Sequence, residues 1–126
     1  MNPYVKAVEE YKSLKPELFP FLLRIEIHEQ YSYDIFEVEP VLDAWFYENG
    51  RIEELTRVFH MRFYGMNFSP LRISSRQPQH LDVISLHEWH WEDFVFEVYP
   101  RDADGKPYAE SFYCRRFDAR IINACV

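Results

Sequence analysis

Residues 41–65 read VLDAWFYENGRIEELTRVFHMRFYG, and the Asn49-Gly50 pair in this stretch separates two runs rich in aromatic and aliphatic residues. Asn-Gly tolerates the positive φ angles that a tight hairpin turn requires. The stretch therefore predicts two antiparallel neighbouring strands, at about 41–48 and 51–64, and the rest of the fold is inferred outward from them.

A second hairpin is predicted from FVFEVYPRDADGKPYAESFYCRRF in the C-terminal half of the chain. Turn-forming residues extend from Pro100 to Pro107, and Gly105 is expected at the position of positive φ. Strands at about 93–99 and 109–117 flank this turn.

The N-terminal residues have helical spacing. Apolar side chains recur every three or four positions from Tyr4 to Leu14, Pro3 suits a first helical turn, and Pro16 ends the pattern. The sequence therefore predicts an amphipathic helix at about 3–15.

The remaining segments have patterns of different clarity. Residues 19–28 alternate between apolar and polar side chains, as in a strand. Residues 29–40 fit two patterns and are predicted to form an edge strand or a structured loop that ends near Pro40. Residues 66–80 are typical of a long connection. Residues 81–91 suit a strand or a short helix, and we favour the strand.

Together these elements predict one α+β domain over residues 1–126, with the N-terminal helix packed on an antiparallel, meander-like β-sheet of five to seven strands. The pattern allows the sheet to curve or to become barrel-like. Hydrophobic residues make up 48% of the chain, which indicates a globular protein rather than a disordered one.

Alternation within the strands sorts the side chains onto two faces. The apolar face is predicted to form the core and contains Leu23, Ile25, Ile27, Leu42, Ala44, Phe46, Phe59, Met61, Phe63, Phe94, Phe96, Val98 and Phe112. The opposite face contains Arg24, Glu26, His28, Asp43, Trp45, Tyr47, His60, Arg62, Tyr64, Glu97, Tyr99, Tyr113 and Arg115. Tyr, Trp and Arg are enriched at binding hot spots, which favours a binding surface over a half-exposed sheet that is aromatic by chance.

Acidic residues are concentrated in the first half of the chain. Residues 1–56 carry 12 acidic and 5 basic side chains, a sum of −7, whereas residues 57–126 carry 9 of each. Arg51 is the only basic residue between Glu26 and Glu54. Such a stretch attracts a basic partner, although it also suits the ordinary solubility charge of an acidic protein.

Composition also argues against several classes of function. The net charge of −7 is unfavourable for direct nucleic-acid binding, which depends on cationic contacts to phosphates. No apolar run reaches the roughly 20 residues of a membrane span, and the N-terminus lacks the apolar stretch of a secretory signal. We therefore expect a cytoplasmic location without membrane association, and interpret Cys114 and Cys125 as free thiols.

One cluster has the composition of a metal site, namely His87, Glu88, His90, Glu92 and Asp93. On a strand the two histidines would point to opposite faces, and the spacing of the HExxH motif is absent. The sequence therefore predicts no metal site, and no cofactor is implied.

A second cluster could carry acid/base chemistry. His60 and Arg62 would lie opposite Asp43 or Glu26 across the sheet, and a histidine beside a carboxylate is tuned toward neutral pH. Structural ion-pair networks have the same composition. We therefore assign no catalytic residue and leave enzymatic activity open, with a non-catalytic role favoured.

The sequence favours a small acidic, non-catalytic protein-binding module of the inhibitor, immunity or anti-defence type, which would cover a basic surface of its partner. The expected contact residues are Trp45, Tyr47, Tyr64, Tyr99, Glu37, Glu39, Asp43, Glu53 and Glu54. The alternative is a small-molecule binder or enzyme that holds an anionic or nucleotide-like ligand in a sheet cavity. That cavity would be lined by His28, His60, Arg62, Tyr64, Tyr99 and Arg115.

Overall fold

The computed structural model describes residues 3–48, 57–67, 79–86, 95–107 and 111–123. In chain order these form α1 (Pro3–Ser13), a 3-10 helix η1 (Pro16–Leu18), β1 (Phe21–Ser32), β2 (Glu37–Tyr47), β3 (Arg57–Tyr64), β4 (Gln79–Ser85), β5 (Phe96–Asp102), β6 (Phe112–Cys114) and β7 (Arg116–Asn123). No helix in these ranges is long and apolar enough to cross a membrane.

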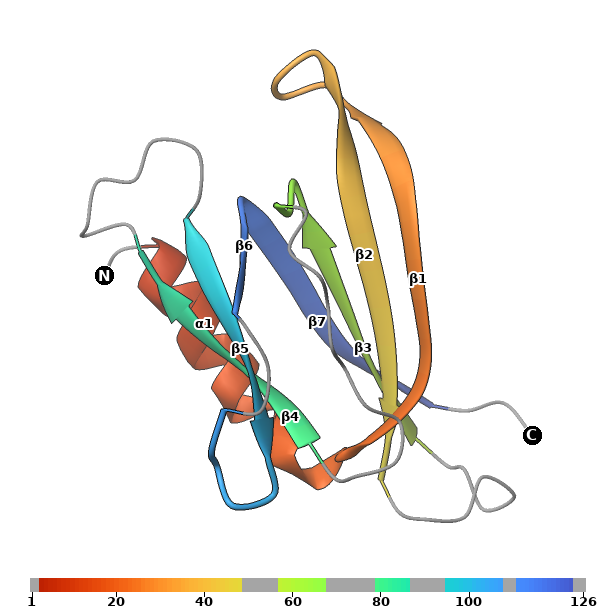
Figure 1. Ribbon diagram of the computed structural model, residues 1–126, viewed down its shortest axis with the longest axis vertical. Helices are drawn as coiled ribbons and strands as arrows, with labels where there is room; N and C mark the ends of the chain where they lie inside the picture. The colour runs from red at the N-terminus through yellow and green to blue at the C-terminus, as the bar shows by residue number, and fades with distance from the viewer. Residues whose placement is uncertain (1–2, 49–56, 68–78, 87–94, 108–110, 124–126) are drawn as a thin grey trace.

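The strands form two sheets rather than one. The large sheet has the order β1-β2-β3-β7 and the small sheet the order β4-β5-β6, with antiparallel pairing throughout. Figure 1 shows α1 and the small sheet on one side of the molecule and the large sheet on the other. The predicted α+β class, N-terminal helix and antiparallel strands are confirmed. The single meander is wrong, because the chain leaves the large sheet after β3 and returns to it as β7. Neither sheet closes on itself in the described strands, so the barrel-like shape is not supported.

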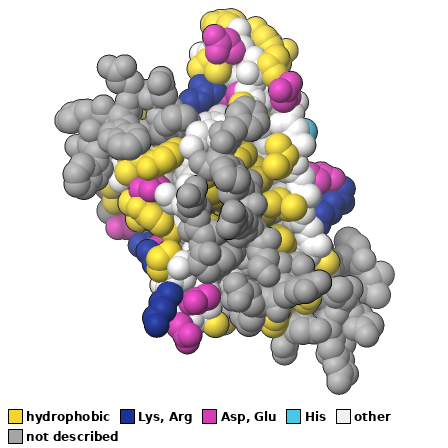
Figure 2. Space-filling model, viewed as in Figure 1, with side chains coloured by type: hydrophobic (Ala, Val, Ile, Leu, Met, Phe, Trp, Pro, Cys, Tyr) yellow, Lys and Arg dark blue, Asp and Glu magenta, His cyan; other side chains and the backbone are white. Residues whose placement is uncertain are grey.

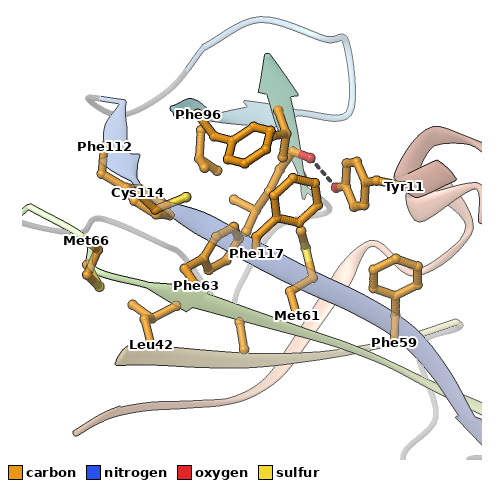
Figure 3. Packing of buried hydrophobic residues seen from close by; sticks show 14 of the residues in the cluster. Tyr11, Leu42, Phe59, Met61, Phe63, Met66, Phe96, Phe112, Cys114 and Phe117 are labelled. Carbon is orange, nitrogen blue, oxygen red and sulfur yellow. Dashed lines mark hydrogen bonds between the residues drawn. The ribbon is translucent and has the colours of Figure 1, made fainter. Parts of the chain in front are cut away.

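Side chains from both sheets and from α1 share one core. Tyr11 of α1 connects them: its ring packs edge-on against Phe59 of β3 and Phe117 of β7, and its hydroxyl donates a hydrogen bond to the carbonyl of Leu81 in β4 (Figure 3). Burial disfavours the phenolate and so raises the pKa of Tyr11. The other buried members of this cluster are Val8, Phe19, Leu42, Ala44, Phe46, Met61, Phe63, Met66, Val83, Phe96, Val98, Phe112 and Cys114.

The predicted core is correct except on β1. Leu23, Ile25 and Ile27 are exposed, Ile27 to 58%. Ile25 and Ile27 do face the same side as their partners on β2, Ala44 and Leu42, but β1 is the edge strand and both side chains remain exposed there. The other described members of the predicted core are buried, and Phe94 lies outside the described residues.

The first predicted hairpin is correct in its strands. β2 and β3 are antiparallel neighbours, while the Asn49-Gly50 turn lies outside the described residues. The register places Tyr47 opposite Val58. A two-residue turn at Asn49-Gly50 would instead place Tyr47 opposite Ile52, so the observed register differs from that of a tight Asn-Gly turn along the whole β2–β3 pair.

The second predicted hairpin is also present. β5 pairs with β6, and Gly105 has the expected positive φ, at 80°. The predicted strand at 109–117 is divided, because Cys114 ends β6 in the small sheet and Arg116 begins β7 in the large sheet. β7 as a whole was not predicted.

Two other segments are described only in part. β4 confirms the strand that was favoured for 81–91 as far as Ser85, and residues 87–91 lie outside the described part of the chain. Of the connection predicted at 66–80, residues 68–78 likewise lie outside it.

Residues 29–40 form the end of a long hairpin between β1 and β2. No described strand pairs with β2 before Val41, which lies opposite Tyr64 of β3. Up to that point β1 and β2 form a two-stranded ribbon that extends beyond the ends of the other strands (Figure 1), and Gly65 donates a backbone hydrogen bond to Pro40 at its base. We call residues 29–40 the projecting hairpin.

Candidate functional site

The outer face of the large sheet, which is turned away from the core, carries most of the predicted site. The cross-strand register arranges its side chains in rows of direct neighbours. One row contains Arg24, Trp45, His60 and Arg120, and the next contains Glu26, Asp43, Arg62 and Asp118. The predicted alternation is therefore confirmed for β2, β3 and the part of β1 from Arg24 onward. Before the register shift at Leu22/Arg24 it is wrong, because Leu22 rather than Leu23 lies beside Phe46.

Asp43 is the centre of this face and is only 1% exposed. Its Oδ1 accepts a hydrogen bond from Nε of Arg62 at 2.7 Å and lies 2.7 Å from Nε2 of His60. Its Oδ2 accepts a second bond from Arg62 at 3.2 Å and lies 3.6 Å from Nδ1 of His28. Burial by itself would raise the pKa of Asp43, but the hydrogen bonds of Arg62 and His60 and the positive charge of Arg62 outweigh it and hold that pKa below its ordinary value.

His60 is held between protein groups on all sides. Nε of Arg120 lies 3.4 Å from Nδ1 of His60. Because a guanidinium can only donate, Nδ1 is the acceptor, and the ring proton is on Nε2, directed at Asp43. The imidazole also stacks on Trp45 at 4.9 Å, and the guanidinium of Arg24 lies over the same indole at 5.1 Å.

This geometry is that of an internally satisfied network. A general base needs a nitrogen lone pair directed at a substrate proton, whereas both nitrogens of His60 are directed at protein groups. The cluster predicted from sequence is therefore assembled, with His28, His60 and Arg62 all converging on Asp43.

Tyr64 and Tyr47 lie on the same outer face with different exposure. Tyr64 is buried, its hydroxyl donates to Asp118 at 3.0 Å, and the guanidinium of Arg116 lies over its ring at 4.0 Å. Tyr47 is half-buried and packs against Phe21 of β1.

Tyr99 belongs to a different surface, because β5 is in the small sheet. Its hydroxyl donates to Glu97 at 2.6 Å, and this bond, together with burial, raises the pKa of Tyr99 to about 12. Ser111 donates to the same carboxylate at 2.6 Å. The expectation that Tyr99 shares a face with Trp45 and His60 is therefore wrong, since it assumed a single sheet.

The predicted acidic contact residues are also in different environments. Glu37 is exposed, whereas Glu39 is 5% exposed and forms an ion pair with Arg115, at the junction of β6 and β7. Gly65 lies against this pair with φ 63°, and a Cβ there would collide with Arg115. Glu53 lies outside the described residues, as do Glu54, His87, Glu88, His90, Glu92 and Asp93.

No three His, Cys, Asp or Glu side chains are grouped to hold a metal ion within the described ranges. Cys114 is a buried free thiol, and burial raises its pKa. A thiol in that environment is poorly ionised and therefore a weak nucleophile.

The two most exposed large apolar side chains among the described residues lie on the projecting hairpin, a surface that the sequence analysis missed. Tyr33 is 81% exposed, Phe36 75% and Val38 57%, and Tyr31 and Ile35 are exposed beside them. Figure 2 shows hydrophobic side chains at this end of the molecule, with acidic side chains among them.

Phe36 also has an unfavourable backbone conformation, with φ 57°. Glycine or asparagine adopts this left-handed region readily, whereas a side chain with a bulky Cβ substituent costs about 1–2 kcal/mol there. Such outliers persist where the surrounding structure holds them and they cluster at functional sites. A Phe in this position gains little from burial, because its ring is exposed.

Acidic side chains predominate around this apolar surface. Residues 25–48 contain seven acidic side chains and no Lys or Arg. Asp34 pairs with Arg116 at 3.0 Å. Glu29 and Glu37 are exposed and have no ionic partner in the described part of the chain. The hairpin therefore presents apolar groups together with unneutralised carboxylates.

A signal for this surface was present in the sequence. Tyr33-Asp34-Ile35-Phe36 makes the turn without Gly, Pro or Asn, and Tyr31 and Val38 follow the same hydrophobic pattern on either side. Asp34 is an ordinary turn residue, but the three large apolar residues around it conflict with ordinary turn chemistry. That conflict indicates residues selected for something other than local folding.

Comparison with known proteins found no match: no protein-family model, no curated protein and no solved structure matches the chain. The functional argument therefore depends on the residues and their geometry.

Proposed function

We propose that this protein is a non-catalytic protein-binding module whose projecting hairpin contacts a basic and apolar surface of its partner. The observation that carries the proposal is the exposure of Tyr33, Phe36 and Val38 at the end of a two-stranded ribbon. An isolated two-stranded ribbon is marginally stable in water, and exposed apolar patches mark interaction sites. A partner that covers the hairpin would stabilise the ribbon and remove its apolar side chains from water.

The residues of the hairpin would have two roles. Tyr33 and Phe36 are the anchors, because large aromatic side chains contribute most of the energy in a typical interface. Glu29 and Glu37 attract the basic partner and orient it, since exposed charges act mainly on the rate and specificity of association. The module would act by occlusion, as expected of an inhibitor or immunity protein.

Residues on the outer face of the large sheet would support this surface. Glu39 and Asp43 are buried and paired with Arg115 and Arg62, so they hold β2 in place rather than meeting the partner. Trp45 remains half-buried and, like Tyr47, extends the candidate surface along β2.

The test is affinity capture from a lysate of the source organism with three baits: wild type, Phe36→Asn and Leu18→Asn. Asparagine tolerates a positive φ, so Phe36→Asn removes the anchor without adding strain. Leu18 lies on η1 and is 50% exposed, which makes it a matched control.

We expect a partner that wild type and Leu18→Asn retain, that Phe36→Asn loses, and that high salt weakens. A partner retained equally by Phe36→Asn contradicts the proposal, as does the absence of any specific partner at low salt.

A further inference from the structure

We propose that β1 is a docking edge, to which the partner adds an extended segment as a further strand of the large sheet. This inference rests on the proposed function and specifies how the partner binds. β1 is the terminal strand of the large sheet and pairs only with β2 among the described strands. An edge strand presents a row of backbone N–H and C=O groups that can pair with another chain.

The edge is accessible along most of its length. From Leu23 to Tyr31 every side chain is exposed on both faces of the strand, apart from the half-buried Glu26. The register with β2 is regular from Arg24 to Ser32, and the irregularity at Leu22/Arg24 lies at the start of the strand. β1 contains no Pro, its bulge lies at its start, and Glu29 is the one charge on its inner side, so an added segment must neutralise that carboxylate.

The side chains beside this edge define the chemistry of the added segment. Ile25, Ile27 and Tyr31 point to the inner side of the sheet, with Glu29 between Ile27 and Tyr31 in the same row. An added strand would place alternate residues next to this row. The segment that fits therefore has apolar side chains at alternate positions, with a Lys or Arg where it passes Glu29.

Charge argues for a different protein as the occupant rather than a second copy of this chain. Residues 25–48 contain seven acidic side chains and no Lys or Arg. Antiparallel pairing of two copies through β1 would leave their hairpins at opposite ends of the interface, but each copy carries a net charge of −7, and a large charge of one sign opposes self-association. A segment with Lys or Arg instead neutralises the unpaired carboxylate of Glu29.

The test uses the full chain, labelled with ¹⁵N, and a blocked peptide in which Val alternates with Lys or Thr. Amide chemical shifts measured during titration identify the strand that the peptide contacts. We expect the largest shifts in β1, and smaller ones in the other edge strands, β4, β6 and β7.

Two modified peptides test whether the backbone is used. In each, alternate residues carry an N-methyl group, and the two differ in which alternate set is methylated. Strand addition uses the amides of one edge of the peptide, so at least one methylated version must lose binding. If both bind like the parent peptide, contact is through side chains alone and the inference is wrong.

Protein variants test the contacts on the inner side of β1. Ile27→Thr should weaken binding about tenfold, because an exposed isoleucine loses part of its apolar contact. Glu29→Lys should weaken it about fivefold, the effect of one exposed ion pair. Glu9→Lys on α1 changes the net charge equally and should leave binding unchanged.

The outcomes separate this inference from the proposed function. Absence of peptide binding, shifts confined to another edge, or self-association through β1 overturns strand addition. If lysate capture still depends on Phe36 in those cases, the proposed function survives with the turn alone as its contact. If neither peptide binding nor Phe36-dependent capture is found, both are wrong.

Discussion

The outer face around Asp43 buries polar side chains, whereas the projecting hairpin exposes apolar ones. The outer face contains charged and aromatic side chains that suggest a binding surface, yet Asp43 and His60 are buried and bonded to their neighbours. The hairpin contains apolar side chains that suggest a core, yet Phe36 and Tyr33 are exposed. An interaction surface is therefore identified by apolar side chains that remain exposed and by charges that remain unpaired in the fold, rather than by residue types alone.

We expect Asp43 to contribute far more to the free energy of unfolding than the exposed carboxylates of the hairpin do. Replacing Asp43 by Ala leaves Arg62 and His60 without their shared acceptor, and should lower the free energy of unfolding by about 3 kcal/mol. Asp34→Ala breaks an exposed ion pair with Arg116, and should cost less than about 1 kcal/mol. Urea denaturation of both variants measures this, and equal losses would remove the distinction between the two regions.

The dependence of stability on pH should have the same origin. The pKa of Asp43 is lowered in the folded protein, so the ionised carboxylate stabilises the fold at pH values above its unfolded pKa of about 3.9. This contribution is lost as the pH falls through the lower, folded pKa. Urea denaturation from neutral to strongly acidic pH should give a flatter profile for Asp43→Asn than for wild type. Parallel profiles would assign the acid sensitivity to other groups.

On the hairpin, removing an apolar side chain should leave stability intact. Phe36→Asn relieves the left-handed strain and loses little burial, so the free energy of unfolding should rise by about 0.5–1 kcal/mol, while partner affinity falls by about 2 kcal/mol. Thermal denaturation and titration with the captured partner measure the two effects. Tyr33→Asn is the control without backbone strain, and should lower affinity without any gain in stability. A loss of more than 1 kcal/mol of stability in Phe36→Asn would place Phe36 in the packing of the fold.

The smallest effect is expected from the exposed charge of the hairpin. Glu37→Lys should weaken partner binding by about 0.5–1 kcal/mol at low salt and reduce its dependence on salt, because Glu37 is exposed and screened by ions. Association kinetics at two salt concentrations measure this, with Glu9→Lys as the control of equal net charge. Equal effects of the two variants would show that only the net charge of the protein matters.

Local patterns predicted much of the secondary structure. Helical spacing identified α1, alternation identified β2 and β3, and turn chemistry identified the hairpin of β5 and β6 with its positive-φ Gly105. Each of these depends on neighbours within a few residues. The turn of the projecting hairpin was missed because its large apolar residues do not have turn chemistry.

The candidate site was only partly predictable. The side of the sheet to which Trp45, His60 and Arg62 point follows from alternation, and the register confirms it. That Tyr99 lies on another sheet, and that Glu39 is buried against Arg115, depends on contacts between residues far apart in the chain. No pattern within β2 or β5 contains that information.

The sequence alone determined which side of each strand is apolar, because successive side chains of a pleated strand point in opposite directions whatever surrounds them. Only the tertiary structure decided which apolar side becomes covered. The small sheet packs over Phe63 through Phe112, whereas Ile27 and Val38 are in contact with solvent, because coverage depends on how far a second layer extends. That extent depends on how the chain divides its strands between two sheets, a choice made by long-range packing.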